Sequence, residues 1–326
     1  MEPPGGTMWR PDRSVRGPER ATLRDVDPLN RVFAEAFTDR YSRDGLVGVR
    51  VPQLNAAIWR YAIEDAGDGA MVWRDAAGEL VAFNMVHRSG VEGWMGPLAV
   101  RPDRQSEGLG STMVLAGVEW LKVEGATTIG LETMPRTVDN IGFYSRLGFM
   151  PGYLTVTLVR DVGRRPAETG ELLSAAGLDA TPVLRECRGL LDRLLPGTDF
   201  TRELALTHEL RIGDTTLIRR DGALTAFALW HSAPLAAGRP KDEVRILKLV
   251  ACSVEDFDRV IEAVQRAAHQ ERVRRLAIRC QSAFADAYLR LVEHGFRVHW
   301  TDLRMMLRGY APPGPRVGIV LSNWEI

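Results

Sequence analysis

Apolar and polar positions follow the same order of patterns in both halves of this chain. Apolar residues at helical spacing predict amphipathic helices over 27–38 and 52–65, and again over 183–195 and 201–208. Apolar runs after these helices predict strands over 69–74, 79–87 and 93–100, and again over 214–219, 223–231 and 244–251. Each half therefore opens with helices and continues into strands that follow one another closely enough to pair antiparallel.

Each half then changes to alternating helices and strands. The predicted elements are a long helix (111–124 and 256–270), a strand (127–133 and 274–280), a short helix (138–147 and 284–293) and a final strand (153–160 and 298–307). Strands separated by a helix favour a crossover connection within one sheet. We therefore predict an α/β (α+β) fold of two tandem domains, each a mixed, mostly antiparallel twisted sheet flanked by helices.

Residue identities support this repeat. Five positions match between 78–87 and 222–231, at an offset of 144 residues. Further along, Leu147-Gly148-Phe149 and His294-Gly295-Phe296 both close a predicted helix, at an offset of 147 residues. The order of elements is thus preserved, as expected for an internal duplication.

Chain length fits two domains, because 326 residues are many for a single hydrophobic core. We expect the first domain over 20–165 and the second over 175–310, joined by a polar Gly/Pro/Ala segment around 161–180. Residues 1–19 are rich in Pro, Gly and Arg, and we expect them to be disordered.

The C-terminal residues 311–326 are a separate feature. A Pro-rich stretch ends the preceding strand, and the apolar run that follows predicts a tail strand. We expect this tail to return to the first domain. It would either add a strand to that sheet or bring Trp324, Glu325 or the terminal carboxylate close to the cleft.

Composition excludes several classes of partner. The 42 basic and 42 acidic residues cancel, so neither a nucleic-acid surface nor an electrostatic membrane surface is expected. No run approaches the roughly 18 apolar residues of a membrane span. Three cysteines without C-x-x-C spacing argue against disulfides and zinc. We expect a cytoplasmic protein without a metal, either a monomer or a homodimer.

The segment most suggestive of chemistry lies between a predicted strand and the first long helix. It reads Gln105-Ser106-Glu107-Gly108-Leu109-Gly110-Ser111. Its two glycines let the backbone turn N–H groups inward, where a helix N-terminus adds further donors and a positive dipole end. The loop therefore suits a pyrophosphate, while the alternative is a glycine turn that only starts a helix.

Over about residues 20–160 the chain resembles the GNAT superfamily (GCN5-related N-acetyltransferases). Gln105-x-x-Gly108-x-Gly110 is similar to the family's Gln/Arg-x-x-Gly-x-Gly/Ala loop, and it comes directly after the predicted strand ending in Leu98-Ala99-Val100. The stretch Phe143-Tyr144-Ser145-Arg146-Leu147-Gly148-Phe149 is similar to the family's second signature. The separation of the two segments is also that of the family.

What the resemblance implies is a site for acetyl-CoA. The backbone of Leu98, Ala99 and Val100 would pair with the pantetheine arm, and the residues Gln105, Ser106, Glu107, Gly108, Leu109, Gly110 and Ser111 would bind the pyrophosphate. Tyr144 would protonate the departing thiolate, since a phenol with a pKa of about 10 is protonated at neutral pH. The alternative for Tyr144 is a tyrosine that only packs its helix on the sheet.

Two further positions belong to the implied cofactor site. Phe143 precedes the tyrosine in the second signature. The family often places an asparagine seven residues before the tyrosine, but this chain has Thr137 there. We assign Asn140 as its substitute.

The resemblance does not identify the base that removes a proton from the acceptor. Histone-modifying relatives have a glutamate six residues before the end of the cofactor strand, where this chain has Trp94. Glu92 and Glu132 are the carboxylate candidates, and either could instead be a solvated charge at a strand end. His87 is a third candidate, but His231 repeats it in the other half, which favours a structural role.

We therefore expect an acyl-CoA-dependent N-acyltransferase. It would move an acetyl group from acetyl-CoA to a primary amine, of a small molecule or a protein, by direct attack in a ternary complex. The alternative is a non-catalytic acyl-CoA-binding regulatory or scaffold protein. Trp59, Trp73 and Trp94 either line the acceptor pocket or belong to the core.

The second half lacks these chemical features. Its segment Ala251-Cys252-Ser253-Val254-Glu255-Asp256-Phe257-Asp258 has no glycine and three carboxylates, which would repel a pyrophosphate. Leu291 stands where the first half has Tyr144. A degenerate copy beside an intact one resembles tandem-domain members such as mycothiol synthase, in which the C-terminal copy is the active one, so the order argues against mycothiol synthesis. We expect the second domain to buttress the first or to wall its acceptor cleft.

Overall fold

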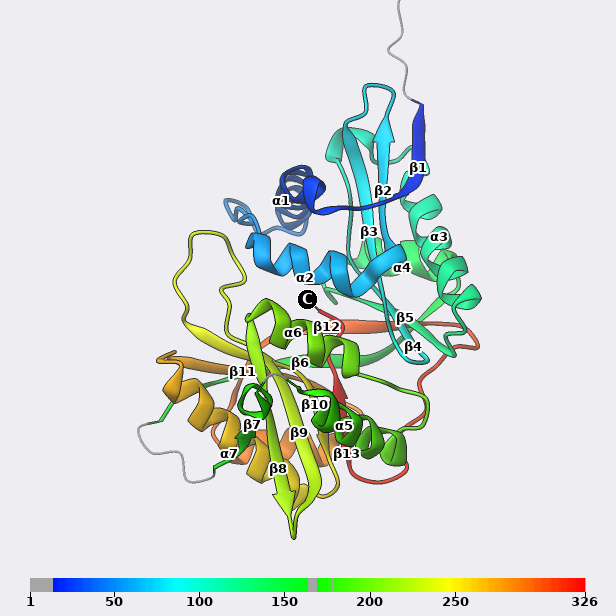
Figure 1. The fold of residues 1–326 in the computed structure, drawn as a ribbon. Helices are drawn as coiled ribbons and strands as arrows, with labels where there is room; N and C mark the ends of the chain where they lie inside the picture. The colour runs from blue at the N-terminus through cyan, green and yellow to red at the C-terminus, as the bar shows by residue number, and fades with distance from the viewer. Residues whose placement is uncertain (1–13, 164–168, 178, 326) are drawn as a thin grey trace, which may run out of the picture.

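The computed structural model describes residues 14–163, 169–177 and 179–325, and the thirteen strands of these residues form one sheet (Figure 1). The strands of the first half are β1 (Val15–Arg20), β2 (Ala70–Asp75), β3 (Leu80–Ser89), β4 (Glu92–Val100), β5 (Thr128–Thr133) and β6 (Phe149–Asp161). Those of the second half are β7 (Glu171–Leu172), β8 (Gly213–Arg220), β9 (Ala223–His231), β10 (Glu243–Ala251), β11 (Arg275–Gln281), β12 (Arg297–Leu307) and β13 (Ile319–Ser322).

The helices lie close to the predicted positions. They are α1 (Val26–Arg43), α2 (Ala56–Ala66), α3 (Leu109–Val123), α4 (Val138–Arg146), α5 (Thr181–Leu194), α6 (Thr201–Leu210), α7 (Val254–Gln270) and α8 (Ala285–Glu293). Short 3-10 helices are η1 (Leu23–Asp25), η2 (Gly67–Gly69), η3 (Pro102–Arg104) and η4 (Leu173–Ala176). The predicted mixed α/β architecture with two similar halves is confirmed.

The two halves exchange their final strands. The main strand order is β1-β2-β3-β4-β5-β12-β6-β11-β10-β9-β8-β7, with β13 paired to β10. Strand β12 of the second half pairs with β5, and strand β6 of the first half pairs with β11. Because β6 and β12 also pair antiparallel with each other, the sheet runs without a break through both halves. In Figure 1 these two strands cross the middle of the molecule. No local pattern in the sequence indicates this exchange.

Strand β4 separates from its parallel neighbour halfway along its length. Residues 92–95 pair with 128–131 of β5, and an irregularity in the pairing with β3 follows between Met95 and Leu98. Residues 98–100 pair with β3 alone among the described strands. The sheet therefore opens beside the C-terminal part of β4, which leaves backbone hydrogen-bonding groups free there.

The second half opens at the equivalent place, and its own tail fills the opening. Residues 243–246 of β10 pair with β11, and residues 248–251 pair antiparallel with β13 instead. Gln281 of β11 also donates from Nε2 to the carbonyl oxygen of Ser322, at 3.2 Å. Tail residues thus satisfy the strand edge that the first half leaves open.

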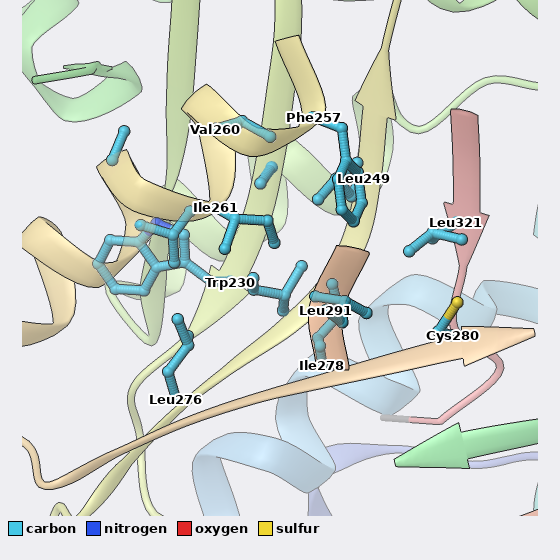
Figure 2. Packing of buried hydrophobic residues seen from close by; sticks show 14 of the residues in the cluster. Trp230, Leu249, Phe257, Val260, Ile261, Leu276, Ile278, Cys280, Leu291 and Leu321 are labelled. Atoms are coloured by element: carbon cyan, nitrogen blue, oxygen red, sulfur yellow. The ribbon is translucent and has the colours of Figure 1, made fainter. Parts of the chain in front are cut away.

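Helices cover both faces of the sheet in each half. In the first half α1 and α2 pack on one face and α3 on the other, while in the second half α5 and α6 oppose α7 and α8. Figure 2 shows Phe257, Val260 and Ile261 of α7 lying over the strand residues Leu249 and Trp230. Helix α7 begins where the Ser253 hydroxyl accepts from the backbone N–H of Asp256, at 3.1 Å. The apolar residues that recur at helical spacing in α7 thus form one buried face of the helix.

The prediction for the N-terminal residues needs correction. Disorder over 1–19 is wrong for residues 15–19, which belong to β1, while residues 1–13 lie outside the described part. Pro18 is tolerated because β1 is an edge strand, and Gly17 leaves room for the ring of Trp73. The two residues of β7 were also not predicted within the connecting segment.

The tail follows the second of its two predicted arrangements. Addition of a strand to the first half is wrong, because β13 pairs with β10 of the second half. Beyond β13 the chain turns toward the first half, and Trp324 joins its core beside α1 and α2. Arg304 stacks on the Trp324 ring, with its guanidinium carbon 3.7 Å from the ring centroid.

Gly130 on β5 tests this packing. A Cβ atom there would lie 2.5 Å from Cζ3 of Trp324 and 2.8 Å from the carbonyl oxygen of Met305. We expect Gly130→Ala to lower the free energy of unfolding by about 1–3 kcal/mol, since overpacking forces the ring or the strand to move. Urea unfolding measures the loss, and carboxypeptidase digestion should release the tail of the variant faster.

Gly142 in α4 supplies the matched control. A Cβ atom at that position would have only the tip of Arg146 as a neighbour, at 3.6 Å. Gly142→Ala should leave the free energy of unfolding unchanged or raise it, because Ala favours helix over Gly. Equal unfolding midpoints for Gly130→Ala and the wild type would contradict the contact between Trp324 and β5.

Candidate functional site

The loop before α3 presents backbone N–H groups at an uncapped helix N-terminus. Gly108 is the N-cap residue with φ of +86°, and Ser106 also has a positive φ, of 65°. The first turn of α3 contains no acidic residue, and the N-cap makes no side-chain hydrogen bond. Such N–H groups combine unsatisfied donors with the positive end of the helix dipole, which is the arrangement that binds phosphate oxygens.

The two glycines of the loop are needed for different reasons. A Cβ atom on Gly108 would meet nothing within 4 Å, so its positive φ and the open backbone matter there. A Cβ atom on Gly110 would lie 3.4 Å from Cζ of Phe143, so Gly110 lets α4 pack against the start of α3. The predicted residue Phe143 thus lies directly behind the loop.

The other predicted loop residues lie around these glycines. Gln105 donates from Nε2 to the carbonyl oxygen of Val100 at 3.0 Å, which ties the loop to the end of β4. The carboxylate of Glu107 accepts from Nε of Arg104 at 3.2 Å. Leu109 is buried in the core, and Ser111 is partly exposed in the first turn.

The equivalent loop of the second half is closed by its own side chains. Ser253 caps α7, and Asp256 in the first turn accepts from Arg220 and from Thr225, each at 2.9 Å. A carboxylate therefore occupies the place where an anion would bind. The contrast agrees with the prediction that only the first half has a phosphate site.

A cavity of about 350 Å³ lies where β4 and β5 separate. Residues from α1, β4, β5, α4, β11, β12 and the tail line it together. They include the predicted residues Leu98, Glu132, Asn140 and Tyr144, and also Phe33, Phe37, Arg40, Tyr41, Met95, Gly96, Pro97, Thr133, Arg279, Trp300, Asp302, Trp324 and Glu325. Both halves and the tail thus contribute walls, which agrees with the expectation that the second domain walls a cleft.

A larger hollow of about 930 Å³ lies in the second half, between the connecting segment and α6. None of the predicted site residues lines it. The smaller cavity beside β4 is therefore the better candidate for chemistry, because the predicted acid, the strand edge and carboxylates meet there.

Tyr144 lies on α4 and lines the cavity. Within this helix it is the residue that is buried. Its ring packs against Phe143 and Phe149, with centroids 5.1 and 6.1 Å away. Burial raises the pKa of the phenol above its usual value, so the hydroxyl stays protonated at neutral pH. Such a group can donate a hydrogen bond or a proton to an anion formed in the cavity.

Asn140, on the turn of α4 before Tyr144, also reaches the cavity. Its Nδ2 lies 3.4 Å from the hydroxyl oxygen of Thr133 on β5. Thr137 instead donates to Asp44, at 2.5 Å, and is fully buried. Of the two residues, Asn140 is the one that could contact a ligand.

Glu132 is fully engaged with neighbouring donors. Its Oε1 accepts from the Thr155 hydroxyl at 2.5 Å and from Nε of Arg304 at 2.9 Å, and its Oε2 accepts from Nη2 of Arg279 at 2.5 Å. Burial raises the pKa of this carboxyl, but the charges of Arg279 and Arg304 outweigh burial and hold the pKa below its usual value. Glu132 is therefore a stable anion and a weak base.

Arg279 is the centre of a larger group, which we call the carboxylate–arginine cluster. It consists of Glu132, Arg279, Asp302, Arg304 and Glu325. Nη2 of Arg279 is 2.9 Å from Oδ2 of Asp302, and its Nη1 contacts Glu325 of the tail. The cluster combines β5 of the first half with β11, β12 and the tail.

Glu92 lies outside the cavity lining. It is buried, and its Oε2 accepts from the hydroxyl of Ser322 on β13 at 2.5 Å. Ser322 also accepts from the buried ammonium group of Lys248, at 2.9 Å. Glu92 thus helps to fix the tail strand, and the structure does not bring it together with Tyr144.

His87 has structural contacts as well. It is fully buried, its Nδ1 lies 2.5 Å from Oδ2 of Asp65, and its ring stacks on Trp94 at 4.1 Å. Trp59, Trp73 and Trp94 are at most 3% exposed and do not line the cavity. For these three tryptophans the core alternative is the correct one.

The cavity also has residues that no sequence motif indicated, among them Tyr41, Arg279, Trp300 and Asp302. Arg279 and the last two belong to strands of the half that lacks a phosphate loop. Without knowledge of the strand exchange, no local motif connects these residues with Tyr144. Arg279 gives no clear signal by itself, because its strand also contains Arg275 and Gln281.

Within the described ranges, no helix is both long and apolar enough to cross a membrane. The same residues contain no group of three or more His, Cys, Asp or Glu side chains arranged to hold a metal ion.

Part of the chain is similar to a known protein family. The model of the Acetyltransferase (GNAT) family matches residues 32–149. A mycothiol acetyltransferase from Actinosynnema mirum is 31% identical over 127 residues, which is 39% of this chain and 41% of that enzyme. The alignment thus spans less than half of that curated relative.

Solved structures resemble nearly the whole chain. A proposed acetyltransferase from Pyrococcus horikoshii has a TM-score of 0.64 at 17% identity, over 93% of this chain and 91% of that one. N-myristoyltransferase from Saccharomyces cerevisiae, with bound myristoyl-CoA, has a TM-score of 0.59 at 11% identity, over 96% and 85%.

A tandem GNAT protein from the clavulanic acid biosynthesis pathway has a TM-score of 0.54 at 13% identity, over 90% of this chain and 98% of that one. At these identities the likeness shows the fold. Residues 32–149 thus match the GNAT acetyltransferase family, and the chain has the fold of two-domain GNAT proteins.

Proposed function

We propose that this protein transfers an acetyl group from acetyl-CoA to a primary amine, by direct attack in a ternary complex. The main support is the cavity in which the open edge of β4, the protonated Tyr144 and the carboxylate–arginine cluster meet. The open loop at the start of α3 lies at the end of the same strand. Each chain would have one such site. We also propose that the first domain spans residues 20–165 and the second domain residues 175–310.

Bound acetyl-CoA would supply the acetyl thioester, and residues of the first half fit it. The uncapped N–H groups from Gly108 onward suit the pyrophosphate. Residues 98–100 of β4 have no partner strand on the side of β5, so their backbone could pair with the amide groups of pantetheine. Tyr144 and Asn140 would then lie near the sulfur.

The charges of the cavity favour a cationic acceptor. Its lining contains the carboxylates Glu132, Asp302 and Glu325, against the guanidinium groups of Arg40 and Arg279. Arg40 is already paired with Asp44 and with Asp139. Acidic charge is thus in excess, which suits an alkylammonium group before it loses its proton.

Aromatic rings of the lining could hold the carbon part of such an acceptor. Phe33, Phe37, Tyr41, Trp300 and Trp324 come from α1, β12 and the tail. We also propose a cytoplasmic location, with which the free cysteines Cys187, Cys252 and Cys280 agree.

Replacement of Tyr144 by Phe tests the proposed acid. Tyr144→Phe should lower kcat by about 10²-fold, because proton donation to a leaving group contributes on that order or more. The Kd for CoA should stay unchanged, since the ring still packs on Phe149. Thiol release from acetyl-CoA over a panel of polyamines, amino sugars and arylalkylamines gives kcat, and calorimetry gives the Kd.

The same assays distinguish the alternative function. Tight CoA binding by the wild type, without thiol release for any amine of the panel, would support a non-catalytic acyl-CoA-binding protein. Equal kcat for the wild type and Tyr144→Phe would instead show that Tyr144 is not the acid, while the protein would still be an acetyltransferase.

Gly108→Glu tests the pyrophosphate loop. The variant places a carboxylate at the positive helix end and a side chain at φ of +86°, so CoA binding should be lost. Gly125→Glu is the matched control, because Gly125 has φ of +79°, has open space around it and follows the far end of α3. Calorimetry should find CoA bound by the control and not by Gly108→Glu. Undiminished binding by Gly108→Glu would exclude this loop as the phosphate site.

A further inference from the structure

A carboxylate of the second half faces the acceptor cavity. Asp302 lies on β12, the strand that the second half contributes next to β5. Its neighbour Leu303 is paired with Thr133, which lines the cavity and contacts Asn140. The strand exchange therefore brings Asp302 into the same cavity as Tyr144 and Leu98.

Two donors fix the orientation of Asp302 and leave part of each oxygen available. Nη2 of Arg279 donates to Oδ2 at 2.9 Å, and Nε1 of Trp300 lies 3.3 Å from Oδ1. The residue is 9% exposed, and it lines the cavity. A carboxylate oxygen can accept more than one hydrogen bond, so room remains for a proton from a ligand.

Each of the other carboxylates is less suited to accept that proton. Both oxygens of Glu132 are already occupied by three donor residues, and Glu92 lies behind β13. Glu325 is half exposed at the end of the described chain, where water competes. Asp302 alone among the four is held inside the cavity by few donors.

We propose that Asp302 is the general base that removes a proton from the attacking amine. This inference rests on the proposed acetyl transfer and adds the group that the degenerate half supplies to the reaction. Asp302 is ionised when the acceptor enters as an ammonium ion, so the two attract each other before the proton moves.

The surrounding charges give this carboxyl suitable basicity. Burial is the largest influence and, with the charges of Glu325 and Glu132, raises the pKa of Asp302 to about 6, against the lowering effect of Arg279. Tyr41 of α1 faces the same group, and burial, Asp302 and Glu325 raise the pKa of its phenol, so it stays neutral. A base with a pKa near 6 is ionised at pH 7 and stronger than an ordinary aspartate.

The proton balance of the reaction closes with these residues. An ammonium acceptor gives its first proton to Asp302, and the neutral nitrogen forms a bond to the acetyl carbon while the C–S bond breaks. Tyr144 gives its proton to the departing sulfur, and the second proton of the nitrogen replaces it. Asp302 returns its proton to solvent, so the sum is one amide, one thiol and one released proton.

Asp302→Asn tests the proposal in the full-length protein. Asn keeps the shape and can still accept from Arg279, while it cannot take a proton. We expect kcat/KM for the best amine of the panel to fall by about 10²-fold, with the Kd for CoA unchanged. In the wild type kcat/KM should fall as pH decreases through about 6, because protonation removes the base, and this limb should be absent in Asp302→Asn.

Two further variants separate a base from a structural carboxylate. Glu325→Gln removes a carboxylate from the same guanidinium group, so it should raise KM for the amine. The acid limb should remain but move to lower pH, because the charge of Glu325 raises the pKa of Asp302. Asp302→Glu should recover part of the lost rate. Hydroxylamine, which is largely unprotonated at neutral pH, should be acetylated by the wild type and Asp302→Asn at rates within a few fold of each other.

The outcomes identify which idea fails. Unchanged kcat/KM in Asp302→Asn, or an acid limb that persists in this variant, would overturn Asp302 as base while the transferase proposal stands. An equal loss with hydroxylamine would show a structural role and overturn it as well. No thiol release by the wild type with any acceptor would remove the proposed function and this inference with it.

Discussion

The antiparallel pairing of β6 with β12 carries each half's final strand into the other half's part of the sheet. Because β12 then lies next to β5, Arg304 reaches Glu132, and Asp302 faces a cavity whose proposed acid, Tyr144, belongs to the first half. A simple side-by-side arrangement of two closed sheets would leave these residues apart. The site therefore depends on this backbone pairing, in which Asp302 itself lies opposite Thr155 of β6.

Each half has a strand whose edge is left open halfway along, and only one of these edges is covered by another of the described strands. Both β4 and β10 lose their parallel neighbour halfway along, and a strand edge in that position needs hydrogen-bond partners. In the second half β13 provides them, and Lys248 holds the tail through Ser322 and the carbonyl oxygen of Asn323. In the first half residues 98–100 keep the edge open beside an uncapped helix. Placing the tail in one opening thus leaves the other for a ligand, and it also brings Trp324 and Glu325 to the cavity.

Local patterns in the sequence predicted most helices and strands, the repeat and the loop around Gly108, because each depends on residues close together in the chain. The strand exchange could not be predicted in this way. Residues 149–161 and 297–307 occupy equivalent places in the repeat, and either could complete either half of the sheet. Strand β1 was missed because a Gly and a Pro stand in the middle of its six residues, while its fit depends on the distant ring of Trp73. Asp302 carries no motif, and its position becomes meaningful only once β12 is placed beside β5.

The carboxylate–arginine cluster suggests a reason for the charged residues in the strands of the second half. Burial of Arg279 costs free energy unless partners offset it, and it has three carboxylates from β5, β12 and the tail. Apolar residues of similar volume usually make an interface at least as stable as buried ion pairs. A half that served only as a buttress would gain nothing from this arrangement. The proposed acceptor cavity, which would attract an ammonium group and then take its proton, would need it, since the same guanidinium group fixes Asp302 while Glu132 and Glu325 raise its pKa.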